Sequence, residues 1–230
     1  MKEFSQVEAE IRGIKTLESG EVIIATMNGL AGGIVPKAAA VFCARHPRLK
    51  ISIRVMFVRD IVQAVIDGEA DLGLAFNLPA TQQLETLWKM DTRLGAVVSR
   101  EHPLAGRDSL SLSECAAYPL IFADKAMLIH GIVADAFSDA GISVDPAFLS
   151  NSIEAMKYLA SGGDAIAFLS KFDIAEEQRN GALTYLPIRN RFLGKNVLSL
   201  VQREKRNRGL AAAMFADEVA RGLRAVADQT

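Results

Sequence analysis

The chain has 230 residues but only two cysteines and three histidines, and aromatic residues make up 7% of it. Cys43 and Cys115 form no C-x-x-C motif, so the sequence predicts neither a disulfide framework nor a zinc ribbon. Because free cysteine is usually buried, two buried thiols are favoured over a redox pair. His46, His102 and His130 lack metal-ligand spacing, and no G-x-S-x-G nucleophile motif occurs. We therefore expect no metal site, no catalytic residue, no cofactor and no enzyme activity.

Long apolar runs and an excess of one charge are missing too. No stretch of about 18 apolar residues occurs, and the N-terminus has no continuous apolar segment, so we expect no membrane span, no signal peptide and a cytoplasmic protein. The formal net charge is −1, which gives no general attraction to nucleic acid or to a membrane surface. Half of the residues are hydrophobic, enough for the cores of two lobes of about 100 residues each.

Strand-like and helix-like segments alternate along the chain. The first series reads, in order, strand "EVIIATM", helix 34–45, strand "KISIRVMF", helix 60–67, strand "ADLGLAF" and strands "ETLWKM" and "LGAVVS". We expect Asp60 to cap the second of these helices and Gly68 to end it. This alternation is typical of right-handed βαβ units and a parallel sheet covered by helices. Before it, Phe4 to Leu17 carry an amphipathic helical stripe.

A second, similar series follows. It reads as a short helix with a capping box at Ser111 and Glu114, strand "PLIFA", helix 128–140, strand "AFLS", a helix capped at Asn151 that reaches Gly162, strand "DAIAFLS", helix 172–179 and strand "LTYLPI". A last strand, "NVLSLVQ", and an amphipathic helix over 209–226 are expected to pack against the first unit. The sequence therefore predicts two successive α/β units.

The ordered set "ESGEVIIATMNGLAGGIVPKAAAVFCARHPRLKISIRVM", "AVIDGEADLGLAF", "VVSREHPLAGRDSLSLSECAAYPLIF", "NSIEAMKYLASGGDAIAFLS" and "GALTYLPI" resembles the effector-binding (regulatory) domain of LysR-type transcriptional regulators. The resemblance runs from Glu18 to the C-terminus. It implies an α/β fold of two Rossmann-like subdomains joined by two crossover strands, like type 2 periplasmic binding proteins, with an effector in the cleft between them.

The resemblance also implies a domain organisation. Residues 1–18 would be the tail of a linker helix, 19–98 and 196–230 subdomain I, and 99–195 subdomain II, with crossovers near 94–99 and 197–202. Members of the family bind DNA through an N-terminal winged helix-turn-helix, which this chain lacks, so DNA binding would need a domain not present here. The resemblance further implies a homodimer in which the helix near Ile34–Ala44 packs on the partner's second unit, around His130–Ala140.

Ligands of open α/β sheets bind beyond the carboxyl ends of the strands, and this rule gives the candidate effector-binding residues. The candidates are Thr26, Met27, Asn28, Gly29, Leu30, Phe57, Val58, Arg59, Phe76, Asn77, Ala123, Asp124, Lys125, Asn151, Ser152, Phe168, Leu169 and Ser170. Neutral donors, two cations and several helix starts favour a small anion such as a carboxylate. The glycine-rich stretch Asn28–Gly33 has no G-x-G-x-x-G pattern, which argues against a nucleotide.

Each candidate also has an ordinary structural explanation. Asn28, Asp124, Asn151 and Ser152 are favoured helix caps with or without a ligand. Arg59 can be a solvated surface charge, and the phenylalanines can be core residues. The glycines near residue 30 can simply allow a turn. The basic residues Arg189, Arg191, Lys195, Arg203, Lys205, Arg206 and Arg208 fit a solvated face better than a phosphate-binding one, because Phe192 is the only aromatic residue among them.

We interpret the sequence as a small-molecule sensor domain of a transcriptional regulator. A solute-binding protein of a transport system is the first alternative, because it shares the two-lobed architecture. An enzyme on the same fold is the second.

Overall fold

The computed structural model describes residues 20–189, 193–204 and 209–228, and these residues form two units. Unit 1 comprises Met1–Met90 and Val197–Thr230, and unit 2 comprises Asp91–Asn196. Each contains a mixed five-stranded sheet with helices, so the expected α/β class is confirmed. Outside the described residues lie the amphipathic stripe from Phe4 to Leu17, most of the basic residues between 189 and 208, and Phe192.

The sheet of unit 1 has the strand order β2-β1-β3-β10-β4. Its strands are β1 (Gly20–Thr26), β2 (Leu49–Val55), β3 (Leu72–Phe76), β4 (Leu84–Thr92) and β10 (Asn196–Arg203). β1 pairs in parallel with β2 and β3, whereas β10 runs antiparallel to β3. The last strand of the chain thus returns to the first sheet, as its sequence position predicts.

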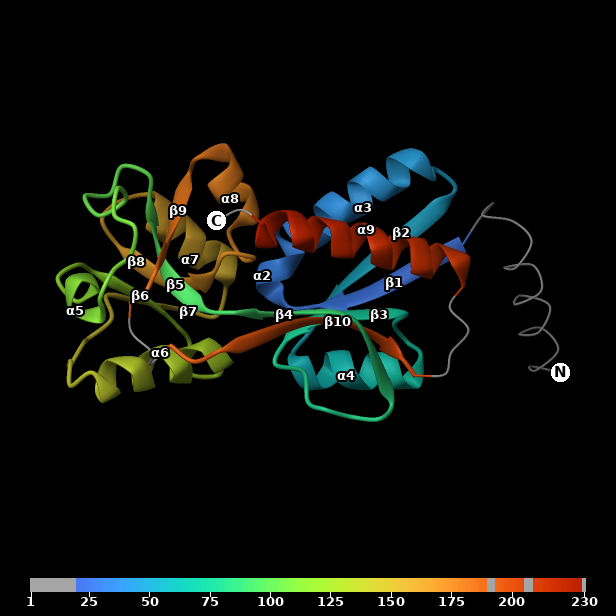
Figure 1. The fold of residues 1–230 in the computed structure, drawn as a ribbon, viewed down its shortest axis with the longest axis horizontal. Coiled ribbons are helices and arrows are strands. Elements are labelled where there is room, and N and C mark those ends of the chain that lie inside the picture. Colours follow the sequence, from blue (N-terminus) through green and yellow to red (C-terminus); the bar gives the residue numbers. More distant parts are fainter. Residues whose placement is uncertain (1–19, 190–192, 205–208, 229–230) are drawn as a thin grey trace, which may run out of the picture. The chain divides into compact units, whose positions relative to one another are not determined.

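Helices cover both faces of this sheet (Figure 1). The helices are α2 (Asn28–Ala31), α3 (Ile34–Arg45), α4 (Val58–Asp67) and α9 (Leu210–Ala227). α3 and α9 lie together on one face, where the rings of Phe42 and Phe215 are 5.3 Å apart between centroids. α4 covers the other face with Ile61, Ala64 and Val65. It ends at Gly68, whose φ of 78° is a left-handed conformation that glycine adopts without steric cost.

The sheet of unit 2 has the order β7-β6-β8-β5-β9. Its strands are β5 (Leu94–Ser99), β6 (Leu120–Ala123), β7 (Phe148–Ser150), β8 (Ile166–Ser170) and β9 (Leu183–Pro187). β6 pairs in parallel with β7 and β8, and β5 runs antiparallel to β8 and β9. This topology repeats that of unit 1, with three parallel strands and one antiparallel strand beside the third.

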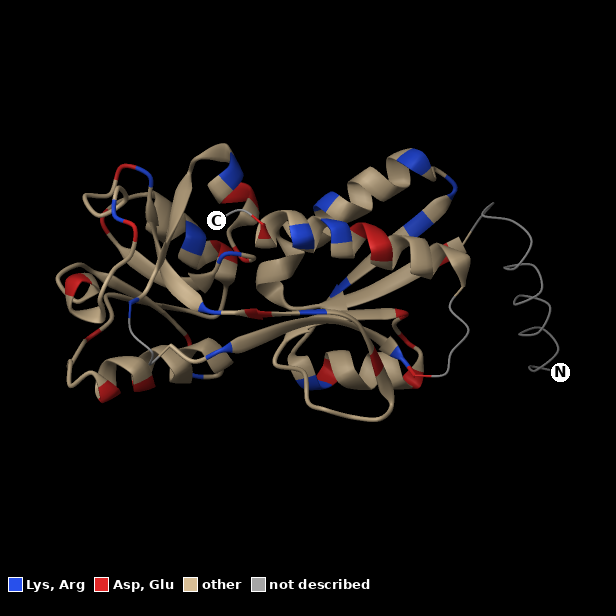
Figure 2. Ribbon diagram, viewed as in Figure 1, with Lys and Arg blue, Asp and Glu red and all other residues tan. Residues whose placement is uncertain are grey.

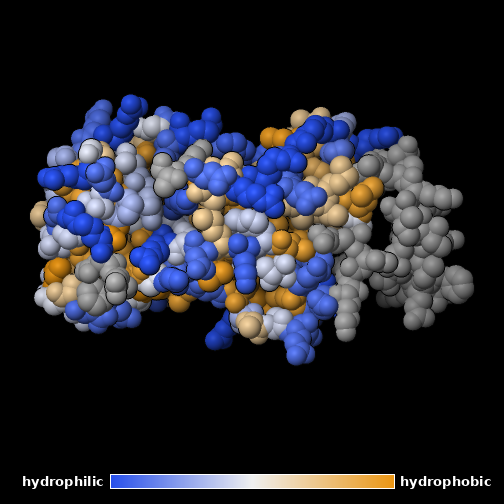
Figure 3. Space-filling model, in the orientation of Figure 1, coloured by the Kyte–Doolittle hydropathy of each residue, from blue (hydrophilic) through white to orange (hydrophobic). Residues whose placement is uncertain are grey.

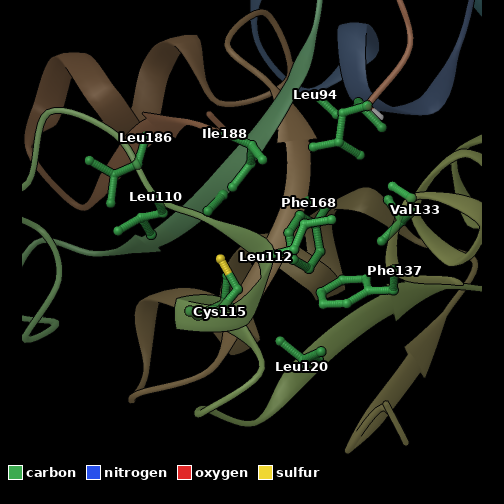
Figure 4. Packing of buried hydrophobic residues seen from close by; sticks show 14 of the residues in the cluster. Leu94, Leu110, Leu112, Cys115, Leu120, Val133, Phe137, Phe168, Leu186 and Ile188 are labelled. Carbon is green, nitrogen blue, oxygen red and sulfur yellow. The ribbon is translucent and has the colours of Figure 1, made fainter. Parts of the chain in front are cut away.

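Unit 2 has the helices α5 (Leu112–Cys115), α6 (Leu128–Asp139), α7 (Ile153–Ser161) and α8 (Ala175–Asn180). Because side chains alternate along a strand, Phe122 and Phe168 face α6, whereas Ile121, Ala167 and Leu169 face α7. Figure 4 shows Phe168 beside Phe137 of α6, and their ring centroids are 5.5 Å apart. The two faces of the sheet thus have separate apolar cores.

Several local details differ from the sequence-based expectations. Phe57, not Asp60, is the N-cap of α4, and Asp60 lies in the first turn, where its charge suits the helix dipole. Ser152, not Asn151, caps α7, and its hydroxyl accepts a hydrogen bond from the Ala155 N–H at 3.3 Å. The capping box of Ser111 is present as expected.

The first boundary between the units also lies elsewhere. Residues 94–99 were expected to be a crossover strand, with subdomain I reaching residue 98. In the structure the chain leaves unit 1 after Met90, because β5 pairs with β9 from Gly95 to Ser99 and with β8 from Leu94 to Val97, both strands of unit 2. The second boundary falls between Asn196 and Val197.

The face of the molecule drawn in Figure 3 is mainly hydrophilic. On this face, hydrophobic residues show as small patches among hydrophilic ones (Figure 3). Charges of both signs are spread over the helices, with basic residues on α3 and acidic ones on α6 (Figure 2). Within the described residues, no helix is both long enough and apolar enough to cross a bilayer.

Candidate functional site

The three parallel strands of unit 1 end at one edge of its sheet. Thr26 at the end of β1 is in register with Val55 of β2 and with Leu74 of β3. The segments that follow them, including residues 27–33, 56–58 and Asn77, therefore start from this edge. The structure thus brings the candidates of unit 1 to the same edge of one sheet.

The first candidate of this edge, Thr26, is a buried and internally bonded residue. Its hydroxyl donates to the Leu74 carbonyl at 3.0 Å, and its own carbonyl accepts from the Met56 N–H at 3.0 Å. Since the side chain is fully buried, Thr26 holds the neighbouring strand ends together and does not present its hydroxyl to solvent.

The glycine-rich stretch begins as a short helix. The N–H groups of Leu30 and Ala31 donate to the Met27 carbonyl, so Met27 is the N-cap of α2 and Asn28 is its first residue. The Asn28 side chain is exposed and caps nothing, whereas Gly29 and Leu30 are buried. The Met27 sulfur accepts from the Phe76 N–H at 3.4 Å, which links this segment to the end of β3.

Asn77 connects the end of β3 to β10. Its N–H donates to the Val197 carbonyl at 2.8 Å, and its side-chain oxygen accepts from the Val197 N–H at 2.9 Å. Asn77 has a φ of 52°, a left-handed conformation that asparagine tolerates better than most residues. Its side-chain oxygen is thus committed to structure.

Phe57, Val58 and Arg59 form the start of α4, and two of them are open to solvent. Phe57 is 72% exposed, and Arg59 is exposed in the first helical turn. No hydrogen bond or ion pair involves the Arg59 guanidinium within the part of the chain that the structure describes. Arg59 and Asn28 are therefore the exposed polar side chains at this edge whose hydrogen-bond donors are available to a ligand.

The strand ends of unit 2 are arranged in the same way. Ala123 of β6 is in register with Ser150 of β7, and the Asp124 N–H donates to the Ser150 carbonyl at 2.8 Å. The Asp124 carboxylate accepts from the Ala126 N–H at 2.9 Å, so it shapes the turn into α6. Lys125 in that turn is exposed.

The turn after β7 has its own hydrogen bonds. The Ser152 N–H donates to the Ser150 hydroxyl at 3.1 Å, and that hydroxyl donates to the Ser152 carbonyl at 3.3 Å. Asn151 between them is exposed. Asn151 and Lys125 are therefore the candidates of unit 2 whose side chains reach solvent.

Ser170 at the end of β8 is buried and bonded to a buried carboxylate. Asp173 accepts from the Ser170 N–H at 2.9 Å and from its hydroxyl at 2.7 Å. Burial raises the pKa of Asp173, although the bonds from Ser170 and the charge of Lys157 act in the opposite direction. With its N–H and hydroxyl committed, Ser170 is a structural residue in this arrangement.

Lys157 on α7 is the buried centre of a partly exposed ionic cluster next to this strand end. Its ammonium lies 2.7 Å from Glu154 and 2.8 Å from Glu177, and it donates to the Asp173 carbonyl at 3.4 Å. Desolvation pulls the pKa of Lys157 down, but the hydrogen bonds to the two glutamates outweigh it and leave the pKa raised. This cluster was not predicted from the sequence. Its signal in the sequence was a lysine on the core-facing side of the helix, three residues after a glutamate.

Phe168 and Leu169 do not reach the strand-end surface. Phe168 is 1% exposed and packs edge-on against Phe122 and Phe137, and Leu169 is buried in the core under α7. They support the sheet behind the loops. The exposed polar candidates are thus a small subset of the expected list, namely Asn28, Arg59, Lys125 and Asn151.

His102 has structural partners, and the two cysteines differ in burial. The His102 ring accepts from the Leu104 N–H at 3.1 Å, which leaves its other nitrogen to donate to the Asp164 carbonyl at 3.1 Å. Cys115 is buried, which raises its pKa to about 12, and Cys43 is only half-buried. Among the described residues, no group of three or more His, Cys, Asp or Glu side chains is placed to hold a metal ion.

Two α/β units, each with strand-end loops along one edge of a mixed sheet, define the class of type 2 periplasmic-binding-protein-like folds. Comparison with known proteins agrees with this class. The chain is similar to the effector-binding domain of QuiR in complex with shikimate, with a TM-score of 0.63 and 20% identity over 90% of this chain and 98% of that one. It is also similar to the regulatory domain of Synechocystis CcmR in complex with 2-PG, with a TM-score of 0.69 and 21% identity over 92% of this chain and 99% of that one.

The family description "LysR substrate binding domain" matches residues 15–224, and the chain belongs to this family. Among curated proteins, it is 27% identical to the HTH-type transcriptional regulator SsuR of Burkholderia cenocepacia over 76% of this chain. It is 24% identical to the HTH-type transcriptional activator CmpR of Synechocystis over 89% of this chain. The chain spans 57% and 66% of the lengths of these two relatives. The expected family is confirmed, and it is a family of transcriptional regulators rather than enzymes.

Proposed function

We propose that the chain senses a small anionic effector, which binds at the carboxyl ends of the parallel strands, and that it controls transcription as part of a LysR-type regulator. The observation that carries the proposal is the pair of cations at these ends. Arg59 follows β2 in unit 1, Lys125 follows β6 in unit 2, and both side chains are exposed. Charge-assisted hydrogen bonds from such cations suit a carboxylate or a phosphate. Shikimate and 2-PG, which structural neighbours bind, support the choice of a small molecule.

Buried residues give the site its shape. Thr26, Asn77 and Ser170 are bonded within their own units, so they hold the strand ends in place. Pre-organised loops lower the entropic cost of binding, and effector binding then acts on the regulator by favouring one arrangement of the protein over another. The chain is thus proposed as a sensor that releases its ligand unchanged.

The test is a thermal-shift screen with small carboxylates and phosphates, shikimate included. A ligand that binds only the folded state raises the melting temperature. For any compound that does so, Arg59→Ala and Lys125→Ala are compared with Lys50→Ala, a matched control at the amino end of β2. We expect Arg59→Ala or Lys125→Ala to weaken binding about tenfold to a hundredfold, the range of a hydrogen bond to a charged group.

Two outcomes would contradict the proposal. One is an undiminished ligand shift in Arg59→Ala, Lys125→Ala and Asn28→Ala alike, because no expected contact would then matter. The other is conversion of the bound compound to a product, detected by mass spectrometry, which would favour the enzyme alternative.

The proposal includes a homodimer in which α3 contacts α6 of the partner. The exposed face of α3 has Val41, 41% exposed, and basic residues, and α6 has Leu128, 55% exposed, at its start and Asp135 and Asp139 in its later turns. Opposite charges and exposed apolar residues on the two helices favour their pairing. Light scattering of Asp135→Lys tests this, since a charge reversal should weaken the dimer, and a wild-type monomer at high concentration would contradict it.

DNA binding is proposed only for a regulator that also carries a winged helix-turn-helix. The net charge of −1 gives this chain no overall positive charge with which to attract DNA phosphates.

A further inference from the structure

A recess of about 500 Å³ lies in unit 2, beside the end of β6. It is formed by one side of α6 and by the segment that leads from α6 toward β7. Its lining residues are Phe122, His130, Ala134, Phe137, Ser138, Gly141, Ile142, Ser143, Val144 and Pro146. None of them belongs to the candidate effector-binding set, so a ligand here would occupy a different site. The volume is in the range of small-molecule pockets, about 300–1,000 Å³.

The accessible lining of the recess is partly apolar. Ile142 and Val144 are half-buried and pack against the core of unit 2 from the segment after α6. Phe122 and Phe137 belong to that core, since they are 4% and 1% exposed and their ring centroids are 5.8 Å apart. Figure 4 shows Phe137 pointing from α6 toward the strands. The half-buried aliphatic side chains are therefore the apolar surface that a ligand can contact.

One polar group at the recess has a defined hydrogen-bonding role. The Nδ1 atom of His130 lies 2.8 Å from the Ala123 carbonyl. Because a carbonyl only accepts, Nδ1 carries the proton, and in the neutral ring Nε2 is left as an acceptor. No hydrogen bond involving Nε2 occurs among the residues that the structure describes. The recess can therefore accept a hydrogen bond from a ligand hydroxyl.

The walls of the recess are held without a ligand. The Ile142 N–H donates to the Phe137 carbonyl at 2.9 Å, and the Gly141 N–H donates to the Ser138 carbonyl at 2.9 Å. Gly141 has a φ of 69°, which lets the chain turn sharply at the end of α6. A site whose walls are already ordered binds with little additional ordering cost.

We infer that this recess is a second small-molecule site, for a small neutral compound with an apolar body and one hydroxyl group, its apolar body against Ile142 and Val144 and its hydroxyl donating to His130 Nε2. The class follows from the lining. The aliphatic side chains select an apolar body, the acceptor selects a hydroxyl donor, and no Lys or Arg lines the recess to attract an acid. The compound would thus differ in charge from the effector proposed for the strand ends.

The test uses phenol as the probe, with toluene and benzoate as comparison compounds. In two-dimensional NMR of the labelled chain, phenol should cause saturable shifts at the His130 ring and at the methyl groups of Ile142 and Val144. Affinity in the millimolar range is expected for so small a probe. Toluene lacks the hydroxyl donor and benzoate carries a negative charge, so each should bind at least about tenfold more weakly than phenol.

Variants separate this site from the strand ends. Ala134→Phe fills the recess and should abolish the phenol shifts, and Ser143→Leu narrows it from an exposed position in case Ala134→Phe does not fold. Arg59→Ala should leave phenol binding unchanged, because Arg59 belongs to the proposed effector site and does not line the recess. The two proposals can therefore be refuted independently. Absence of saturable shifts, equal shifts with toluene, or shifts that persist in both recess variants would overturn the inference.

Discussion

Replacement of Lys157 by methionine tests whether the ionic cluster beside Ser170 stabilises unit 2. Methionine has nearly the length of lysine and keeps the apolar contacts of the stem, but it has no charge. The substitution removes the cation that lies between Glu154 and Glu177 and leaves both carboxylates without it. One oxygen of Glu177 is already buried with no hydrogen-bond partner in the described part of the chain.

The magnitude follows from burial. Removal of one partner from a fully buried ion pair costs about 3–5 kcal/mol. Here the side chain of Lys157 is 4% exposed, but Glu154 is 53% and Glu177 23% exposed, so water solvates part of the charge left behind. We therefore expect Lys157→Met to lower the free energy of unfolding by about 2–4 kcal/mol. For a chain of this size, that corresponds to a melting temperature lower by roughly 5–15 °C.

The assay is urea and thermal unfolding followed by circular dichroism, with two matched variants. Lys50→Met is the control, because Lys50 is 72% exposed in its pair with Glu21 and should contribute little. Adding Glu177→Gln to Lys157→Met should restore part of the loss, since it removes a carboxylate that has lost its cation. A melting temperature of Lys157→Met equal to that of Lys50→Met would refute the reasoning.

Four further predictions concern the fold of unit 2. Gly95→Ala should destabilise the protein by about 1–3 kcal/mol in urea unfolding, because a Cβ there would lie 2.5 Å from the Tyr185 ring and 2.7 Å from a backbone carbonyl. In contrast, Gly131→Ala on exposed α6 meets no atom within 4 Å and should stabilise it by about 0.5–1 kcal/mol, and equal effects would contradict both. Burial raises the pKa of Asp173 above its ordinary 3.8, so the folded state favours the protonated carboxyl group. The stabilisation that comes from this group is complete below pH 3.8 and is lost as the pH rises through the folded-state pKa. Asp173→Asn keeps the acceptor for Ser170 and should flatten this dependence in unfolding measured from pH 4 upward, whereas an unchanged pH profile would count against it. Finally, the Cys115 thiol, whose pKa is raised to about 12, should react with a disulfide reagent only after unfolding, and rapid modification of the folded protein would show that it is accessible.

Much of the fold could be predicted because it depends on local patterns. The left-handed glycine at Gly68, the capping box at Ser111 and the limits of α3 follow from residues that are neighbours in the chain. Cap choice between adjacent residues was less predictable. Ser152 rather than Asn151 caps α7, since the cap depends on which residue is extended just before the helix turns.

The candidate site was predicted only in outline. Topology identifies the strand ends, so Arg59 and Lys125 could be named from the order of strands and helices. Whether Thr26, Phe168 and Ser170 are exposed depends on which side of the sheet each residue faces and on what covers that side. The recess beside His130 combines α6 with a segment that has no regular pattern, and no sequence signal pointed to it.

The sequence alone thus determined the alternation of strands and helices, the repetition of one α/β plan and the family, because these depend on periodicity and on short motifs. Only the tertiary structure decided that residues 94–99 belong to unit 2, that Lys157 is buried among carboxylates, and that Ser170 is committed to Asp173. The physical reason is that strand pairing, burial and hydrogen-bond partners depend on the surrounding packing as well as on each residue and its sequence neighbours.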